Sequence, residues 1–179
     1  MVKVTLPNGA EREVEQGASV ADLAGSISSS LKKNAIAGKV NGKVVDLAFP
    51  LNEDAAVEIL TPDAEQSLEV LRHSAAHLMA QALKRLYGEK TVKLGIGPVI
   101  EDGFYYDIDM DTSLTPEDLP RIEKEMENIV KENLEISRRE VSREEAIRIY
   151  TELGDPLKLE LIRALPEGET ISIYDQGEF

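Results

Sequence analysis

Apolar and polar residues alternate over residues 2–6 and again over residues 11–15, and the pair Asn8-Gly9 separates the two runs. Alternation with a period of two is typical of a strand with one buried face. An Asn-Gly pair supplies the positive φ angles that a two-residue hairpin turn requires. The chain is therefore predicted to begin with a β-hairpin.

The pattern up to residue 60 predicts one helix and three further strands. Ser19 followed by Asp22 resembles a capping box with Asp in place of Glu, and the helix is predicted to run to about Ser28. The three strands are predicted at residues 35–40, 44–47 and 56–60, with a second Asn-Gly turn at 41–42. The order β-β-α-β-β-β describes a small ubiquitin-like β-grasp fold, which Pro62 closes because proline cannot extend a strand ladder.

From residue 64 the pattern changes to that of a long helix, predicted to run from Ala64 to Tyr87 and to end at Gly88. Further on, Thr115 and Ser142 each begin a helix-start signature. The predicted elements are a strand at 90–99, a turn at 101–103, a strand at 104–109, a helix at 115–133, a strand at 135–141, a helix from 142, a short helix at 157–164 and a strand at 170–174. The fold class is therefore α+β, with a β-grasp domain at residues 1–62 and a second α+β domain at 63–179, built on a long helix and an antiparallel sheet.

The net charge is −14, and most of it lies in the second predicted domain. Residues 1–62 carry 6 Lys and Arg against 8 Asp and Glu, and residues 63–179 carry 14 against 26. Lys and Arg that neutralise phosphates supply most of the nonspecific affinity for nucleic acids. This composition argues against a broad RNA-binding surface. If the chain belongs to a protein that binds RNA, most of the binding affinity must come from residues outside the chain.

Cysteine usage and hydropathy restrict the class of protein further. The chain contains no cysteine, so neither a disulfide nor a thiolate zinc site can form within it. No apolar run approaches the roughly 18 residues that a membrane span needs, and residues 1–7 form a strand pattern rather than a signal peptide. We expect a cytoplasmic protein with no membrane partner.

The two histidines of the chain, His73 and His77, lie four residues apart on the long predicted helix. This spacing puts both imidazoles on one face, one turn apart. At about 100° per residue they lie opposite the apolar stripe of the helix. That stripe consists of Leu68, Leu71, Ala75, Leu78, Met79, Ala82 and Leu86. The histidines are therefore predicted to face solvent or a cleft.

Three interpretations of the histidine pair follow from its chemistry. Two histidines at this spacing also occur by chance on a solvated helix face. A metal site needs at least a third ligand, which only a carboxylate could supply here. A pair that works as a general base suits histidine, whose ordinary pKa of about 6.5 lies near working pH.

Residues 71–78 (LRHSAAHL) and 94–107 (LGIGPVIEDGFYYD) closely resemble the editing domain of threonyl-tRNA synthetases of the bacterial type. Residues 6–9 (LPNG) and 36–42 (IAGKVNG) are similar to the TGS domain that precedes it in that family. The resemblance covers the whole chain in order. Other proteins with TGS domains, and the alanyl-tRNA synthetase editing domains that share the two-histidine motif, do not combine both pieces with the GPVIxDGFYYD run.

The resemblance implies that the second domain, in a complete protein, hydrolyses tRNA(Thr) mischarged with serine. His73 and His77 match the HxxxH pair of the family, and His73 is the candidate that orients the attacking water or the terminal ribose hydroxyl. Lys158 matches a lysine of the editing pocket, and Tyr106 a tyrosine that binds substrate there. Without the resemblance, the pattern predicts that Lys158 is a solvent-exposed surface lysine. For Tyr106, a role in the hydrophobic core is as credible as a role in a pocket.

The resemblance also predicts what this chain lacks. The family continues into an acidic segment and a CxxxH motif that complete the editing pocket, and the chain contains neither a cysteine nor a third histidine. ATP, magnesium and zinc belong to an aminoacylation domain that is absent, so we expect no cofactor here. Family dimerisation likewise uses absent regions. We therefore expect a fragment that is inactive in ligation and impaired in editing.

Two alternatives to an enzyme fragment remain at this point. The chain could be a non-catalytic binding or regulatory module that contains a TGS domain. It could instead be a metal-dependent hydrolase, or a metal sensor, built on His73 and His77.

Overall fold

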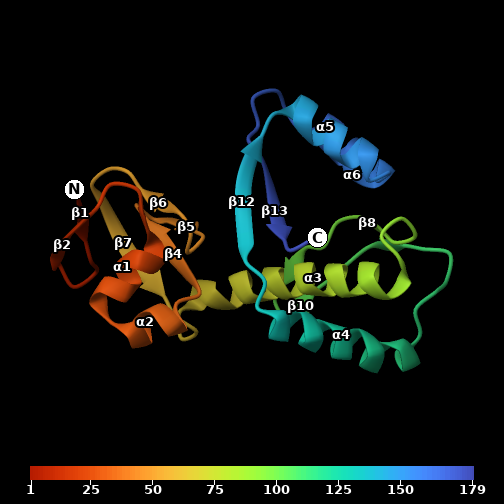
Figure 1. Cartoon of the computed structure of the whole chain (residues 1–179), viewed down its shortest axis with the longest axis horizontal. Coiled ribbons are helices and arrows are strands. Elements are labelled where there is room, and N and C mark those ends of the chain that lie inside the picture. Colours follow the sequence, from red (N-terminus) through yellow and green to blue (C-terminus); the bar gives the residue numbers. More distant parts are fainter. The chain divides into compact units, whose positions relative to one another are not determined.

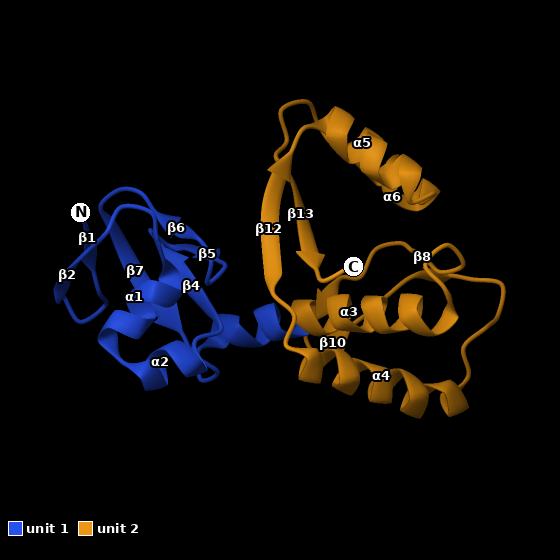
Figure 2. Cartoon of the chain, in the orientation of Figure 1, with its two compact units in different colours: residues 1–72 blue, residues 73–179 orange.

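The structure, a computed structural model, describes all residues of the chain, 1–179. The chain folds as two compact units, residues 1–72 and 73–179 (Figure 2). The division falls within helix α3, Glu65–Tyr87, whereas the predicted domain boundary at residue 62 lies just before that helix. Both units mix helices and strands, which confirms the predicted α+β class.

The first unit contains a five-stranded sheet in the order β2-β1-β7-β4-β5 (Figure 1). Strands β1 and β7 pair in parallel, and the other neighbours in this sheet pair antiparallel. Strands β3 and β6 form a separate short ladder. The elements are β1 Val2–Thr5, β2 Glu11–Val14, β3 Ala18–Ser19, α1 Val20–Ile27, α2 Ser29–Asn34, β4 Ala37–Val40, β5 Lys43–Val45, β6 Pro50–Leu51 and β7 Ala55–Leu60.

Local signals in the sequence produce the turns and the first helix of this unit. Asn41 and Gly42 both adopt positive φ angles, 49° and 85°, between β4 and β5, as a tight hairpin requires. Ser19 and Asp22 form the predicted capping box at the start of α1, with two reciprocal hydrogen bonds of 3.1 Å. Helix α1 packs on the sheet because its buried side chains share a core with those of the strands, namely Val20 and Leu23 with Val2, Val4, Val14, Leu51, Ala55 and Val57.

Helix α2 was not predicted from the sequence. It is only six residues long, none of its side chains is buried, and so it has no apolar periodicity to reveal it. Its N-cap is Ser28, whose side chain accepts a hydrogen bond of 3.0 Å from the amide of Leu31.

The second unit combines the remainder of α3 with short ladders and three further α-helices (Figure 1). A hairpin of two ladders, β8 with β11 and β9 with β10, follows α3, and β12 pairs with β13 antiparallel. The elements are β8 Lys93–Leu94, β9 Val99–Ile100, β10 Gly103–Phe104, β11 Ile108–Asp109, the 3₁₀ turn Pro116–Asp118, α4 Leu119–Glu132, β12 Ile136–Val141, α5 Arg143–Glu152, α6 Pro156–Ala164 and β13 Ile171–Gln176.

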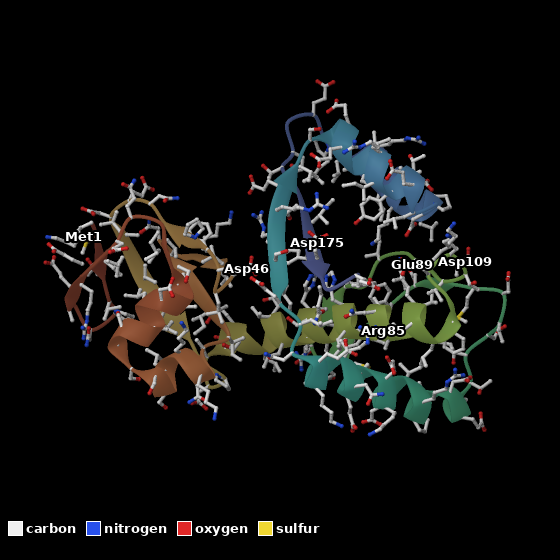
Figure 3. All side chains as sticks on the ribbon, in the orientation of Figure 1. Met1, Asp46, Arg85, Glu89, Asp109 and Asp175 are labelled. Atoms are coloured by element: carbon white, nitrogen blue, oxygen red, sulfur yellow. The ribbon has the colours of Figure 1, made fainter.

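The core of the second unit lies between α3, α4 and the hairpin. Its buried members are Ala80, Ala82, Leu83, Val92, Leu94, Ile122 and Ile129. Outside this core, Arg85 on α3 joins α3 to α4, since its guanidinium hydrogen-bonds to Glu132 at 2.5 and 2.9 Å and lies 3.4 Å from Glu125 (Figure 3). This ion pair raises the pKa of Arg85 above its ordinary value.

The structure corrects two details of the predicted second half. The strands expected at 90–99 and 104–109 are broken into two-residue ladders, although further backbone hydrogen bonds join them along the hairpin. The predicted apolar stripe of α3 holds only in its C-terminal part, where Leu78, Met79, Ala82 and Leu86 pack in the core, whereas Leu68 and Leu71 are 51% and 43% exposed. A stripe calculation assumes that one face is covered along the whole helix, whereas the core of the second unit includes α3 residues only from Leu78 onward.

Candidate functional site

The two histidines lie in contact on α3. Their Nε2 atoms are 3.0 Å apart and their ring centroids 4.7 Å apart. A hydrogen bond between two Nε2 atoms requires a proton on one of them and a free lone pair on the other, so one ring donates and the other accepts, according to their tautomers. His73 is exposed and His77 is half-buried.

The hairpin that follows α3 supplies a second wall of the site. Gly95 and Gly97, which lie between β8 and β9, and Val99 at the start of β9 line the same pocket as the histidines. Gly95 donates a backbone hydrogen bond of 2.8 Å to the carbonyl of Asp107, and the amide of Asp107 donates one of 3.1 Å to Ile96. These bonds keep the segment extended where no regular ladder is formed.

Helix α6 supplies the cation of the site. Asp155 caps the helix by accepting a hydrogen bond of 3.1 Å from the amide of Lys158. The side chain of Lys158 then reaches the hairpin, where Nζ donates a hydrogen bond of 3.1 Å to the carbonyl oxygen of Gly95. The Asp155-Pro156 pair is a helix-start signal that the sequence contains, although no role was predicted from it.

Tyr106 comes from the returning half of the hairpin and lines the pocket with its ring half-buried. Burial raises the pKa of Tyr106 most, and the charges of Tyr150 and Asp155 raise it further. The phenol is therefore a neutral hydrogen-bonding group at physiological pH.

One pocket of about 360 Å³ brings all four predicted site residues together, His73, His77, Tyr106 and Lys158. The other residues that line it are Ala76, Gly95, Ile96, Gly97, Pro98, Val99 and Leu161. The sequence offered no geometric reason for Lys158 or Tyr106 to lie beside the histidines. Tyr174 on β13 was not predicted at all, and its ring centroid lies 6.4 Å from that of His77.

The electrostatics of the pocket keep His77 uncharged. Burial, and then the charges of His73 and Lys158, lower the pKa of His77 to about 4. Burial also lowers the pKa of Lys158, an effect that Asp155 opposes and Lys84 reinforces. The site thus offers a neutral imidazole, which its low pKa makes a weak base but which can still accept a hydrogen bond, and an amine that stabilises negative charge when it is protonated.

The chain has few side chains that could bind a metal ion at this site. No three His, Cys, Asp or Glu side chains of the chain lie together in an arrangement that could hold a metal ion. The histidines supply two nitrogen ligands, one short of the three protein ligands typical of a catalytic zinc site.

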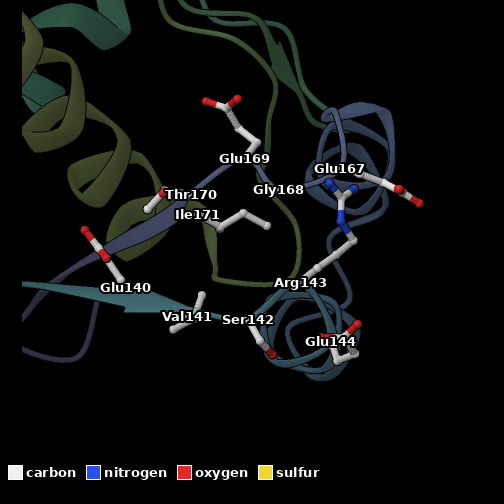
Figure 4. A pocket seen from close by; sticks show the side chains of 10 residues that line it. All are labelled: Glu140, Val141, Ser142, Arg143, Glu144, Glu167, Gly168, Glu169, Thr170 and Ile171. Carbon is white, nitrogen blue, oxygen red and sulfur yellow. The ribbon is translucent and has the colours of Figure 1, made fainter.

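A second hollow, of about 580 Å³, lies where β12 meets α5 and the chain enters β13 (Figure 4). None of the predicted site residues lines it. Its one cationic side chain, Arg143, donates hydrogen bonds to the carbonyls of Ile162, Leu165 and Pro166 and so ties α5 to the end of α6. The remaining charged side chains around it are glutamates, namely Glu140, Glu144, Glu167 and Glu169.

Comparison with known proteins identifies the relatives of the chain. Residues 2–61 match the TGS domain. The whole chain is 64% identical over 179 residues to the threonine–tRNA ligase of Geobacillus sp. (strain WCH70) and 61% identical over 179 residues to threonine–tRNA ligase 1 of Bacillus subtilis (strain 168). It is 59% identical over 178 residues to the threonine–tRNA ligase of Listeria monocytogenes serotype 4a (strain HCC23).

The chain covers 28% of the length of each of these three relatives and matches their N-terminal region. This confirms the resemblance drawn from residues 71–78 and 94–107. Separately, none of the helices combines the length and the apolar composition that a membrane span requires.

Proposed function

We propose that this chain is the N-terminal region of a threonine–tRNA ligase and that its second unit hydrolyses the ester of tRNA(Thr) mischarged with serine. One observation carries the proposal. His73, His77, Tyr106 and Lys158, which come from three separate elements, line a single pocket. The similarity to threonine–tRNA ligases along the whole chain supports the substrate class.

The need for such a reaction follows from the chemistry of the amino acids. Serine lacks one methyl group of threonine, and a missing methylene gives a binding site only about 1–3 kcal/mol of discrimination. A ligase for threonine therefore charges serine at a rate that a second, hydrolytic site must correct. The bond to be cut is an activated ester, so a positioned water and a proton acceptor suffice.

The histidine pair is proposed to position the attacking water through hydrogen bonds to neutral ring nitrogens. His77 is neutral at working pH because its pKa is about 4, and its Nε2 lies 3.0 Å from that of His73. His73 is the more exposed of the two, and it is therefore the one that orients the water or the terminal ribose hydroxyl. The hydrogen bond between the rings fixes the orientation of both.

Lys158 and Tyr106 are proposed to hold the substrate. The Lys158 ammonium, fixed by its hydrogen bond to Gly95, can stabilise the negative charge that develops on the ester oxygen. The Tyr106 hydroxyl stays protonated, because burial raises its pKa, and can donate to a polar group of the substrate.

The 179 residues alone are proposed to be poor catalysts. They contain no cysteine and only two histidines, so they cannot supply the CxxxH motif that the resemblance attributes to the editing pocket. We propose that tRNA(Thr) mischarged with serine is the partner of the longer protein. ATP, magnesium and zinc belong to its ligation reaction and not to this region.

Single-turnover hydrolysis of Ser-tRNA(Thr) tests the proposal. Three proteins are compared, namely this chain, the chain extended through the CxxxH segment, and the extended chain with His73→Ala, each also with Thr-tRNA(Thr). The extended chain is expected to hydrolyse the seryl ester and to spare the threonyl ester, and His73→Ala is expected to reduce the rate at least a hundredfold. An extended chain without activity would leave the alternative of a non-catalytic TGS-containing module.

A zinc titration separates the metal alternative. Histidine side-chain NMR signals of the extended chain are recorded as zinc is added up to one equivalent. Unchanged His73 and His77 signals would remove the metal-dependent hydrolase, whereas saturation at one equivalent would favour it.

A further inference from the structure

Gly97 lies against the ring of Tyr106 in the wall of the pocket. A Cβ atom at Gly97 would come within 2.8 Å of Cδ2 and Cε2 of Tyr106 and within 3.1 Å of Cζ. Real Cβ atoms are essentially never found closer than 3.0 Å to such neighbours. The aromatic ring therefore occupies the space that any larger residue at position 97 would need.

The backbone at Gly97 does not itself require glycine. Its φ is not among the positive values of the chain, which distinguishes it from turn glycines such as Gly42 and Gly154. The absence of a side chain at position 97 is thus explained by the contact with Tyr106 and not by the conformation of the chain.

The Tyr106 ring packs against the core of the second unit, whose members include the fully buried Ala80 and Leu83. Protein cores are close-packed, so a ring pushed from position 97 cannot move deeper into them without disturbing other side chains. The open space that it can enter is the pocket, which both residues line.

We infer that Gly97 is a positioning residue that seats the Tyr106 ring and thereby sets the depth of the pocket. A methyl group at position 97 tilts the ring into the pocket and reduces the space for the acyl group of an ester substrate. The substrate part of this inference rests on the proposed function, whereas the seating of the ring does not.

The seating is tested without any ligand in a double-mutant cycle of Gly97→Ala and Tyr106→Leu. Gly97→Ala is expected to shift the Tyr106 ring signals and to lower Tm by about 3–5 °C. In the Tyr106→Leu background the same substitution is expected to have little effect, because the smaller side chain leaves space for the methyl group. Gly25→Ala is the control, since its Cβ would meet only the flexible side chain of Lys32, and it leaves the Tyr106 signals unchanged.

The pocket depth is tested with a stable substrate mimic, 3′-(L-seryl)amino-3′-deoxyadenosine, whose binding to the chain extended through the CxxxH segment is followed by NMR. Gly97→Ala is expected to weaken its binding about tenfold or more. Wild-type affinity in a variant whose ring has moved would overturn the inference, as would additive effects in the cycle. If the mimic fails to bind the unsubstituted extended chain, the proposed function fails, while coupling between positions 97 and 106 still supports the seating of the ring.

Discussion

The Nε2 atoms of His73 and His77 lie 3.0 Å apart on one face of α3, which makes the two imidazoles a single hydrogen-bonded unit. His77 is the more buried partner, and the charges of His73 and Lys158 add to the effect of burial on its pKa. The behaviour of the pocket with pH therefore depends on groups from two elements, α3 and α6.

His77 is predicted to titrate near pH 4 in an NMR experiment that follows its ring protons. His73→Ala is expected to raise that midpoint, because it removes a like charge, but not to the ordinary value of 6.5, because burial is the larger cause. A midpoint near 6.5 in the unsubstituted chain would contradict the burial of this ring.

The low pKa of His77 also predicts how stability changes with pH. Above pH 6.5 the ring is neutral in both the folded and unfolded states. Between pH 6.5 and about 4 the unfolded state binds the proton first, so the free energy of unfolding falls as the pH falls. After allowance for partial solvent screening, we expect a loss of about 1–2 kcal/mol. Urea unfolding at pH 7 and pH 4.5 measures it, and His77→Gln, which has no titrating ring, is expected to lose less.

Lys158→Met is predicted to remove a charge from the pocket while it preserves the fold. The substitution keeps the length of the side chain, and the lost hydrogen bond to the Gly95 carbonyl is expected to cost about 1 kcal/mol or less in the free energy of unfolding. Because the Lys158 charge lowers the pKa of His77, the His77 midpoint should rise in the NMR titration. An unchanged midpoint would show that the two groups do not interact.

Asp155 is predicted to support the site through the start of α6. Asp155→Ala removes the cap on the Lys158 amide and is expected to cost about 1–2 kcal/mol in urea unfolding. Asp155→Asn can keep the cap, since its side-chain oxygen accepts the same hydrogen bond. It should therefore recover most of the stability, while it lowers the pKa of Lys158 by removing the carboxylate that opposes the effect of burial. Equal losses in the two variants would contradict a capping role.

Arg85→Ala is predicted to loosen α3 from α4. The guanidinium forms a two-pronged ion pair with Glu132, so we expect a loss of about 1 kcal/mol in the free energy of unfolding. Lys124→Ala is the control, because Lys124 pairs with Glu127 within α4 on an exposed surface and should change stability less than Arg85→Ala does. The difference between the variants should shrink in high salt, which screens exposed ion pairs.

Short-range signals explain which parts of the fold were predictable. The Asn41-Gly42 turn, the Ser19–Asp22 capping box and the end of α3 before Gly88 each depend on residues within a few positions of one another. The periodic pattern of hydrophobic residues can be recognised in the sequence where one face of a helix or strand is buried along its whole length. Helix α2 was missed because none of its side chains is buried, and the predicted stripe of α3 fails at Leu68 and Leu71, which precede the part of the helix that packs in the core.

The sequence by itself determined the α+β class, the order of most elements and the pairing of His73 with His77 one helical turn apart, since all of these depend on local propensity and spacing. Its resemblance to a family supplied Lys158 and Tyr106 as candidates. Only the tertiary structure decided that these two side chains line one pocket with the histidines, that Gly97 lies against the Tyr106 ring, and that the pKa of His77 is low. Those properties arise from burial and from contacts between segments that are distant in the sequence. Neither burial nor such contacts can be predicted from short stretches of sequence.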